Sequence, residues 1–125
     1  MPKTVKRICV LDRTKEPGSI GEPLYLDVKS VFYGMENAPL VIGGRYGLAG
    51  KDTTPAQIIA VYANLASKNP KNMFTVGIND DVTYTSLEVG EEVNVAGDKA
   101  SQLIFWGLGS DGTVGANKST IKLIG

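Results

Sequence analysis

Short apolar runs alternate along this chain with longer stretches of helical periodicity, and Pro or Gly separates them. The apolar runs cover residues 5–11, 39–43 and 73–78, and the helical stretches begin at Pro23 and Pro55. This alternation is typical of β-α-β units built around a mostly parallel sheet. The expected fold class is therefore α/β with three layers, in which a mostly parallel sheet is flanked by helices.

Both expected helices carry start signals. Pro23 suits the first position of a helix, where a backbone N–H is not needed, and Gly34 can cap the end of that helix. In the second helix Thr54 and Gln57 have the spacing of a capping box, and Pro55 lies just inside the start. The second helix is the most strongly marked element of the sequence.

The last third of the chain has a different organisation. Residues 87–89 could form a short edge strand, and the turn-rich stretch 91–101 is expected to be a linker. A new strand at 102–106, a glycine turn and a helix from near Thr113 then follow. One strand and one helix cannot form a core alone, so this pattern predicts the first step of a further domain.

The composition argues against several kinds of function. There is no histidine, which removes Ser-His-Asp and Cys-His catalysis and the commonest zinc ligand. Lys plus Arg and Asp plus Glu both number 13, and no basic stripe occurs, so a nucleic-acid partner is not expected. The single cysteine, Cys9, can hold no iron–sulfur cluster and lies in an apolar run, so we expect a small buried side chain. No bilayer-length apolar run or signal peptide occurs, which predicts a cytoplasmic protein without a membrane partner.

The segment GLGSDG at 107–112 is the strongest candidate site. It matches G-x-G-x-x-G between an expected strand and an expected helix, the context in which glycines and free helix N–H groups bind a diphosphate. Gly115 would give room for close helix packing, and Lys118 could reach a phosphate. Asp111 could cap the helix or accept a hydrogen bond from a nucleotide hydroxyl or amine. The same pattern also fits a glycine-rich turn that binds nothing, and the residues alone leave both readings open.

Structural roles are expected for the other conspicuous residues. Residues 43–51, GGRYGLAGK, resemble a P-loop but have Arg45 where the first glycine of the motif should stand, so a structural loop is expected. Asp80-Asp81 could hold a metal ion, although adjacent carboxylates in a turn are usually solvated. Phe105 and Trp106 end the expected strand, which favours core packing over base stacking.

Four phrases point to a family: ICVLDRTKEPGSIGEPLYLDV, VIGGRYGLAGKDTTPAQ, FTVGINDDVTYTSL and FWGLGSDGTVGANKSTIKLIG. Together they closely resemble the pyruvate:ferredoxin (flavodoxin) oxidoreductases, or pyruvate synthases, over essentially the whole chain. That family's chains are roughly ten times longer, so the resemblance implies a fragment. It places residues 1–90 in a domain like the C-terminal domain of transketolase, 91–101 in a linker, and 102–125 at the start of the next domain.

The resemblance also implies a reaction and its cofactors. The family decarboxylates pyruvate oxidatively with coenzyme A, giving acetyl-CoA, carbon dioxide and reduced ferredoxin or flavodoxin. Thiamine diphosphate, magnesium and iron–sulfur clusters do the chemistry, and none of these is expected in this piece, for which no catalytic residue and no metal ligand are predicted. Its partners would be the remaining domains of the parent, which is expected to be a homodimer. By resemblance the coenzyme A region includes Gly109, Ser110, Asp111, Gly112, Thr113, Asn117 and Lys118.

Three functions are therefore weighed. The first is a scaffold fragment of that oxidoreductase, inactive alone, which positions the coenzyme A domain against the thiamine domains. The second is a small nucleotide- or coenzyme A-binding module that uses the GLGSDG turn. The third is a non-catalytic structural protein.

Overall fold

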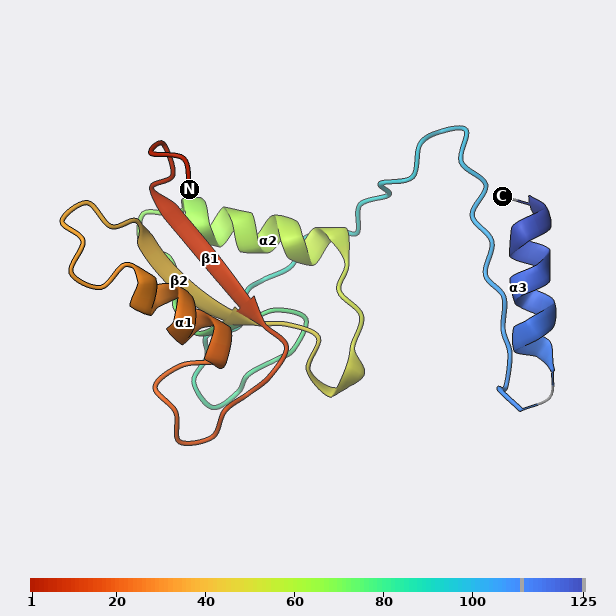
Figure 1. The fold of residues 1–125 in the computed structure, drawn as a ribbon, viewed down its shortest axis with the longest axis horizontal. Helices are drawn as coiled ribbons and strands as arrows, with labels where there is room; N and C mark the ends of the chain where they lie inside the picture. The colour runs from red at the N-terminus through yellow and green to blue at the C-terminus, as the bar shows by residue number, and fades with distance from the viewer. Residues whose placement is uncertain (111, 125) are drawn as a thin grey trace. The chain divides into compact units, whose positions relative to one another are not determined.

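The computed structural model describes residues 1–110 and 112–124, and its chain divides into two compact units, Met1–Val95 and Ala96–Gly125. The second unit contains α3 (Thr113–Ile124). The first unit contains β1 (Arg7–Asp12), α1 (Pro23–Val31), β2 (Leu40–Arg45), the short 3-10 helix η1 (Leu48–Gly50), α2 (Pro55–Ala66) and β3 (Phe74–Thr75) (Figure 1).

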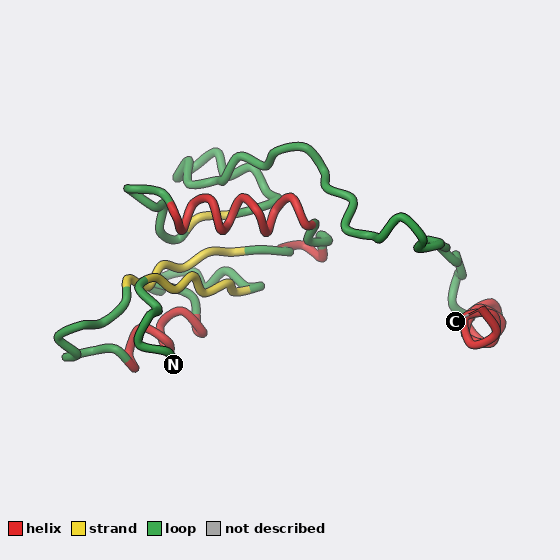
Figure 2. The backbone as a smooth tube through the Cα atoms, turned by 90° about the horizontal axis from the view of Figure 1, so that it is seen from above, coloured by secondary structure: helices red, strands yellow, loops and turns green. Residues whose placement is uncertain are grey.

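The three strands form one parallel sheet in the order β1-β2-β3. The register pairs Asp12 of β1 with Arg45 of β2, so these two charged residues end their strands together. Helices lie on both sides of the sheet, which is seen edge-on in Figure 2. The predicted α/β class, with a parallel sheet flanked by helices, is confirmed.

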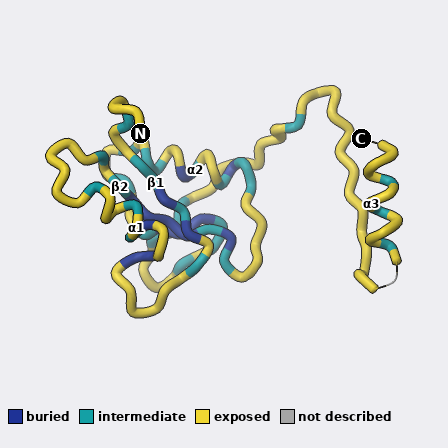
Figure 3. Tube along the Cα trace, in the orientation of Figure 1, coloured by how far each residue is buried: buried dark blue, intermediate teal, exposed yellow. Residues whose placement is uncertain are grey.

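The core of the first unit lies between α2 and one face of the sheet. Ile42, Phe74 and Val76 are buried there against Val61 of α2, and Cys9 packs at the margin of this cluster. Figure 3 shows buried segments along β1 and β2. Ile42 and Cys9 pair across β2 and β1, as expected for residues on one face of a parallel sheet. The apolar periodicity of the sequence thus places the core correctly.

Two glycines of β2 allow aromatic rings to lie directly on the sheet. A Cβ at Gly44 would come within 2.3 Å of the Phe74 ring, and a Cβ at Gly43 would come within 2.9 Å of the Tyr25 ring. Because successive positions of a strand point to opposite faces, each face receives one ring. The expectation that residues 43–51 form a loop from their first residue is therefore wrong for Gly43, Gly44 and Arg45, which belong to β2.

Helix α2 is fixed at both ends. The Thr54 side chain accepts a hydrogen bond from the Gln57 backbone N–H at 3.4 Å, which confirms the predicted cap. At the other end, the Arg7 guanidinium donates to the carbonyl oxygens of Leu65 and Ser67, both at 2.6 Å. Carbonyls in the last helical turn lack intrahelical partners, so Arg7 satisfies them and ties β1 to α2.

The third strand is shorter than the run 73–78 predicts. Only Phe74 and Thr75 pair with β2, because Gly77 has a φ of +74° that turns the chain out of the extended conformation. The edge strand expected at 87–89 appears instead as an isolated bridge between Thr75 and Ser86.

The strand predicted at 102–106 is not formed, which corrects the sequence analysis. These residues have no assigned strand structure, and all five are exposed. An extended segment becomes a strand only when another strand completes its ladder of hydrogen bonds, and the second unit has α3 as its one regular element among the described residues. The helix expected from near Thr113 is confirmed as α3.

The contact between Gly44 and Phe74 gives a stability prediction. In Gly44→Ala the new methyl group would overlap the Phe74 ring, so we expect the free energy of unfolding to fall by about 2 kcal/mol or more. Urea unfolding followed by circular dichroism measures this change. Gly90→Ala is the matched control, because a Cβ there meets open space. Equal midpoints for the two variants would contradict the described packing.

Candidate functional site

The candidate site is built at the carboxyl ends of the strands, where two buried acidic residues organise the start of α1. Asp12, at the end of β1, accepts hydrogen bonds from the backbone N–H groups of Leu24 and Tyr25, both at 3.1 Å. These are N–H groups of the first turn, which otherwise lack partners. The N-terminus of α1 is therefore already occupied by a carboxylate of the chain itself.

Glu22, immediately before α1, holds the guanidinium of Arg45. Its Oε1 accepts from Arg45 Nε, and its Oε2 accepts from the backbone N–H of Glu16 at 2.7 Å. Arg45 also donates through NH1 to the carbonyl oxygen of Met73 at 3.0 Å. Both partners of the ion pair are buried, Glu22 to 1 % exposure, so the pair is fixed rather than solvated.

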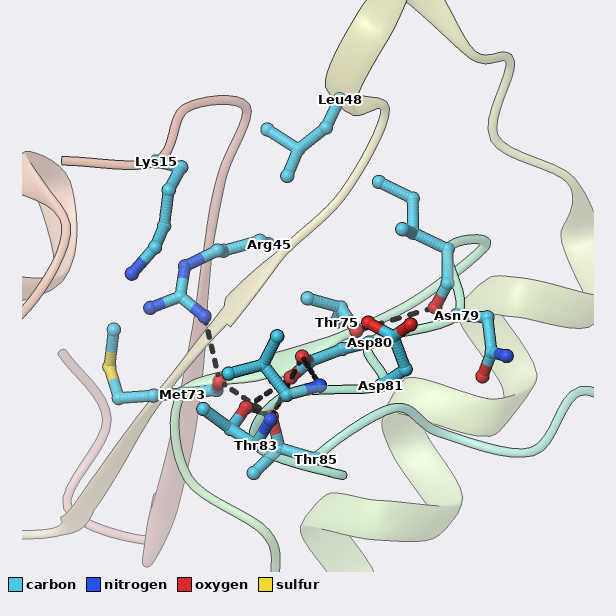
Figure 4. A pocket seen from close by; sticks show the side chains of 12 residues that line it. Lys15, Arg45, Leu48, Met73, Thr75, Asn79, Asp80, Asp81, Thr83 and Thr85 are labelled. Carbon is cyan, nitrogen blue, oxygen red and sulfur yellow. Dashed lines mark hydrogen bonds between the residues drawn. The ribbon is translucent and has the colours of Figure 1, made fainter. Parts of the chain in front are cut away.

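A cavity of about 550 Å³ opens beside this ion pair (Figure 4). Its cationic groups are Arg45, at the end of β2, and Lys15, in the loop after β1. Its acidic groups, Asp80 and Asp81, lie in the loop after β3 (Figure 4). Ligands of open parallel sheets bind at this carboxyl edge, so the place is typical of a binding site.

The carboxylate of Asp80 is saturated by its own loop. Oδ1 accepts from the backbone N–H groups of Val82 and Thr83 at 3.1 and 3.0 Å, and Oδ2 accepts from the hydroxyls of Thr83 and Thr85. Hydrogen bonding by the Thr83 side chain, then by its backbone N–H, lowers the pKa of Asp80 well below its ordinary value. Asp80 thus organises the loop, and these four hydrogen bonds use the acceptor sites that a metal ion would need.

No metal site emerges elsewhere in the part of the chain that the structure describes. Residues 1–110 and 112–124 contain no group of three or more His, Cys, Asp or Glu side chains placed to hold an ion. The Cys9 thiol is half-buried, and burial raises its pKa to about 11, so it stays protonated near neutral pH. Across the same residues, no helix combines the length and apolar character needed to cross a membrane.

The residues predicted to bind coenzyme A lie in the second unit. Gly109 and Gly112 have φ values of +100° and +84°, so the turn uses the conformations that glycine permits. Thr113 begins α3, and Asn117 donates from its side-chain amide to the Trp106 carbonyl oxygen at 3.4 Å. Ser110 and Lys118 are exposed, and Asp111, the strongest single candidate, lies outside the described residues.

Phe105 and Trp106 were expected in a core, and the structure contradicts this for Trp106. Its side chain is 81 % exposed, and that of Phe105 is 37 % exposed. The expectation assumed a strand at 102–106, and without that strand nothing holds alternate side chains against a second layer.

The cavity and its two cations do not follow from any motif of the sequence. The sequence marks Arg45 only as the residue that departs from the P-loop pattern, and it gives Lys15 no distinguishing motif. One signal was available: both follow apolar strands, and the carboxyl ends of parallel strands meet at one edge of a sheet.

These features define an α/β protein whose candidate binding positions lie at the carboxyl ends of parallel strands and before a helix. No protein-family model matches the chain. The chain is 58 % identical over 126 aligned positions to pyruvate-flavodoxin oxidoreductase of Enterobacter agglomerans. It is also 58 % identical over 125 positions to pyruvate:ferredoxin oxidoreductase of Moorella thermoacetica.

Both matches cover the whole chain but only 11 % of each relative. A mitochondrial pyruvate dehydrogenase (NADP(+)) of Euglena gracilis matches at 56 % identity over 129 positions, again along the whole chain, which spans 7 % of that protein. The chain is therefore homologous to one segment of the pyruvate oxidoreductases, as a fragment of such an enzyme would be, and the predicted resemblance is confirmed.

The hydrogen bonds to Asp80 predict how stability depends on pH. A carboxylate whose folded-state pKa is depressed stabilises the fold above its unfolded-state pKa of about 4, and this contribution is lost as the pH falls below that value. We expect the free energy of unfolding to decline between about pH 5 and pH 3, and less steeply in Asp80→Asn. Urea unfolding across this range measures both slopes.

The control for this experiment is Asp81→Asn. Asp81 is the neighbouring acid, and its side chain accepts no hydrogen bond within residues 1–110 and 112–124. In Asp81→Asn the free energy of unfolding should decline with falling pH about as steeply as in the unchanged chain. If the free energy of unfolding falls equally steeply with pH in the unchanged chain and in both variants, Asp80 does not accept the hydrogen bonds described.

Proposed function

We propose that this chain serves as a scaffold segment of a pyruvate oxidoreductase and is inactive alone. One observation carries the proposal: relatives named for flavodoxin, ferredoxin and NADP(+) all match the same segment, at 58, 58 and 56 % identity. The electron acceptor in these names changes while the similarity does not, and pyruvate is common to all of them. We therefore assign the segment to the part of the enzyme that these relatives share, whichever electron acceptor they are named for.

The reaction proposed for the whole enzyme is oxidative decarboxylation of pyruvate with coenzyme A, giving acetyl-CoA and carbon dioxide, with electrons passing to ferredoxin or flavodoxin. Thiamine diphosphate with magnesium would supply the decarboxylation chemistry, and iron–sulfur clusters would carry the electrons. The side chains described here do not fit either group: the one cysteine is half-buried and protonated, and Asp80 is saturated. We therefore assign both groups to other parts of the enzyme.

The role assigned to the chain is to hold neighbouring domains in place. Residues 1–90 are proposed as a domain like the C-terminal domain of transketolase, 91–101 as a linker, and 102–125 as the start of the next domain. The exposed apolar side chains of 103–106 support the last assignment, because such residues are normally covered in a complete domain. The other domains of a homodimeric, cytoplasmic parent would provide that cover.

A graft tests this role. The chain would replace its matching segment in the Moorella thermoacetica enzyme, to which it aligns over 125 positions. We expect coenzyme A-dependent reduction of methyl viologen by pyruvate, with kcat within about tenfold of the parent. The isolated chain, given pyruvate, coenzyme A and thiamine diphosphate with magnesium, should show no turnover.

The control graft carries Gly44→Ala, which disturbs the sheet without touching a charged group. It should lose thermal stability relative to the unchanged graft. A graft that folds and retains its clusters, yet transfers no electrons from pyruvate, would refute the proposal.

We further propose that the turn before α3 contacts coenzyme A in the whole enzyme. The left-handed conformations of Gly109 and Gly112 support this, since they let a ligand approach the backbone at a helix start. The proposed contact residues are Gly109, Ser110, Asp111, Gly112, Thr113, Asn117 and Lys118.

Lys118 gives the test of this contact. In the graft, Lys118→Met should raise the KM for coenzyme A about tenfold and leave the KM for pyruvate unchanged, because one charge-assisted contact is lost. Lys122→Met, in the last turn of the same helix and also exposed, is the matched control. Equal effects of the two substitutions on the KM for coenzyme A would count against the assignment.

A further inference from the structure

The outer side of β1 is an open edge of the sheet. In the part of the chain that the structure describes, the order β1-β2-β3 places no strand beyond β1. The backbone carbonyl oxygens of Lys6 and Asp12 accept hydrogen bonds from N–H groups at the two ends of β2, so the even-numbered residues turn their backbone groups toward β2. Arg7, Cys9 and Leu11 therefore direct their N–H and C=O groups outward, and these groups make no hydrogen bond within the described residues.

The α2 side of this open edge is apolar. A cleft of about 410 Å³ lies beside β1, lined by Cys9 and Leu11 of the strand and by Ile58 and Tyr62 of α2, among others. The Tyr62 side chain is 68 % exposed and that of Ile58 is 37 % exposed. An unpaired strand edge beside exposed apolar side chains is a template for a further strand with its own covering layer.

A second copy of the chain offers the complementary surface. Antiparallel pairing of the two β1 strands about a two-fold axis perpendicular to the sheet brings their outward backbone groups together. The same axis puts both α2 helices on one face, so Ile58 and Tyr62 of each copy lie toward the cleft of the other. We propose that two copies of the chain associate in this way and that their sheets join into one.

Charge selects the register of this pairing. Two-fold symmetry allows a register centred on position 9 or on position 10, and each pairs most of the six-residue strand. The register centred on position 10 sets Arg7 opposite Arg13 of the second copy, and like charges directly opposite are destabilising. The register centred on position 9 instead sets Lys6 opposite Asp12 of the second copy. The pair is therefore centred on Cys9.

This inference concerns the chain by itself and does not depend on the proposed function. Sedimentation equilibrium should show monomers and dimers with a Kd on the order of 10 μM, since one strand pair with a small apolar contact lies at the low end of interface sizes. Hydrogen exchange followed by NMR locates the contact. Raising the chain concentration above the Kd should slow exchange of the amide protons of Arg7, Cys9 and Leu11.

Cys9→Pro tests the strand pairing directly, because it removes the N–H at the centre of the paired strands. Proline is tolerated on an edge strand where the N–H points away from the sheet, as it does here. We expect the dimer Kd to rise at least about tenfold. Cys9→Ala is the matched control: it loses the same thiol but keeps the N–H, so it should dimerise as the unchanged chain does.

Tyr62→Lys tests the cleft without altering β1. It would bring two ammonium groups together across the axis, so we expect the dimer Kd to rise about tenfold. The exposure of Tyr62 means that the fold should be retained, which far-UV circular dichroism checks. Tyr33→Lys is the matched control, because Tyr33 follows α1, is 93 % exposed and does not line the cleft. That variant should dimerise normally.

Three results would overturn the inference. A chain that stays monomeric up to about 1 mM would leave the edge to a strand of some other polypeptide segment. Equal dimerisation of Cys9→Pro and Cys9→Ala, with both variants folded, would place the contact elsewhere, for example on the exposed apolar residues 103–106. Equal effects of Tyr62→Lys and Tyr33→Lys would do the same, and this second pair decides the matter if Cys9→Pro does not fold.

Discussion

The first unit depends on one buried ion pair. Glu22 stands before α1, Arg45 ends β2, and Arg45 also holds the Met73 carbonyl just before β3. Three segments distant in sequence therefore meet at one guanidinium. Removing one partner of such a pair leaves an uncompensated buried charge, which typically costs about 3–5 kcal/mol. The geometry of the carboxyl edge, with its cavity, follows from this constraint.

The start of α1 limits what kind of site this edge can be. In many α/β proteins a helix N-terminus binds the anionic ligand directly. Here Asp12 occupies the N-terminus of α1, so its N–H groups are not available. Within the first unit, the positive charge at this edge therefore comes from the side chains of Arg45 and Lys15 and not from helix N–H groups.

The sequence predicts the parallel α/β class, the capped start of α2 and the helix α3, because each has a local signal such as Pro55 or the apolar periodicity. It predicts too long a third strand, because the left-handed conformation of Gly77 and the close approach of the Gln57 side chain to it become evident only in the fold. It also misses the cavity, because Lys15 and Arg45 are 30 positions apart and only the pairing of β1 with β2 brings their strand ends together. Likewise, residues 102–106 have the apolar pattern of a strand, but no neighbouring strand pairs with them. Local sequence does not reveal whether such a partner strand is present.

The close contact of Gly44 with Phe74 has an evolutionary consequence. A larger residue at position 44 becomes tolerable only after the aromatic ring at position 74 is replaced by something smaller, and a lone change at 74 would leave a void over the glycine. Intermediate sequences on either route are penalised, so the two sites should drift as a linked pair, and lineages that carry this ring should keep its glycine.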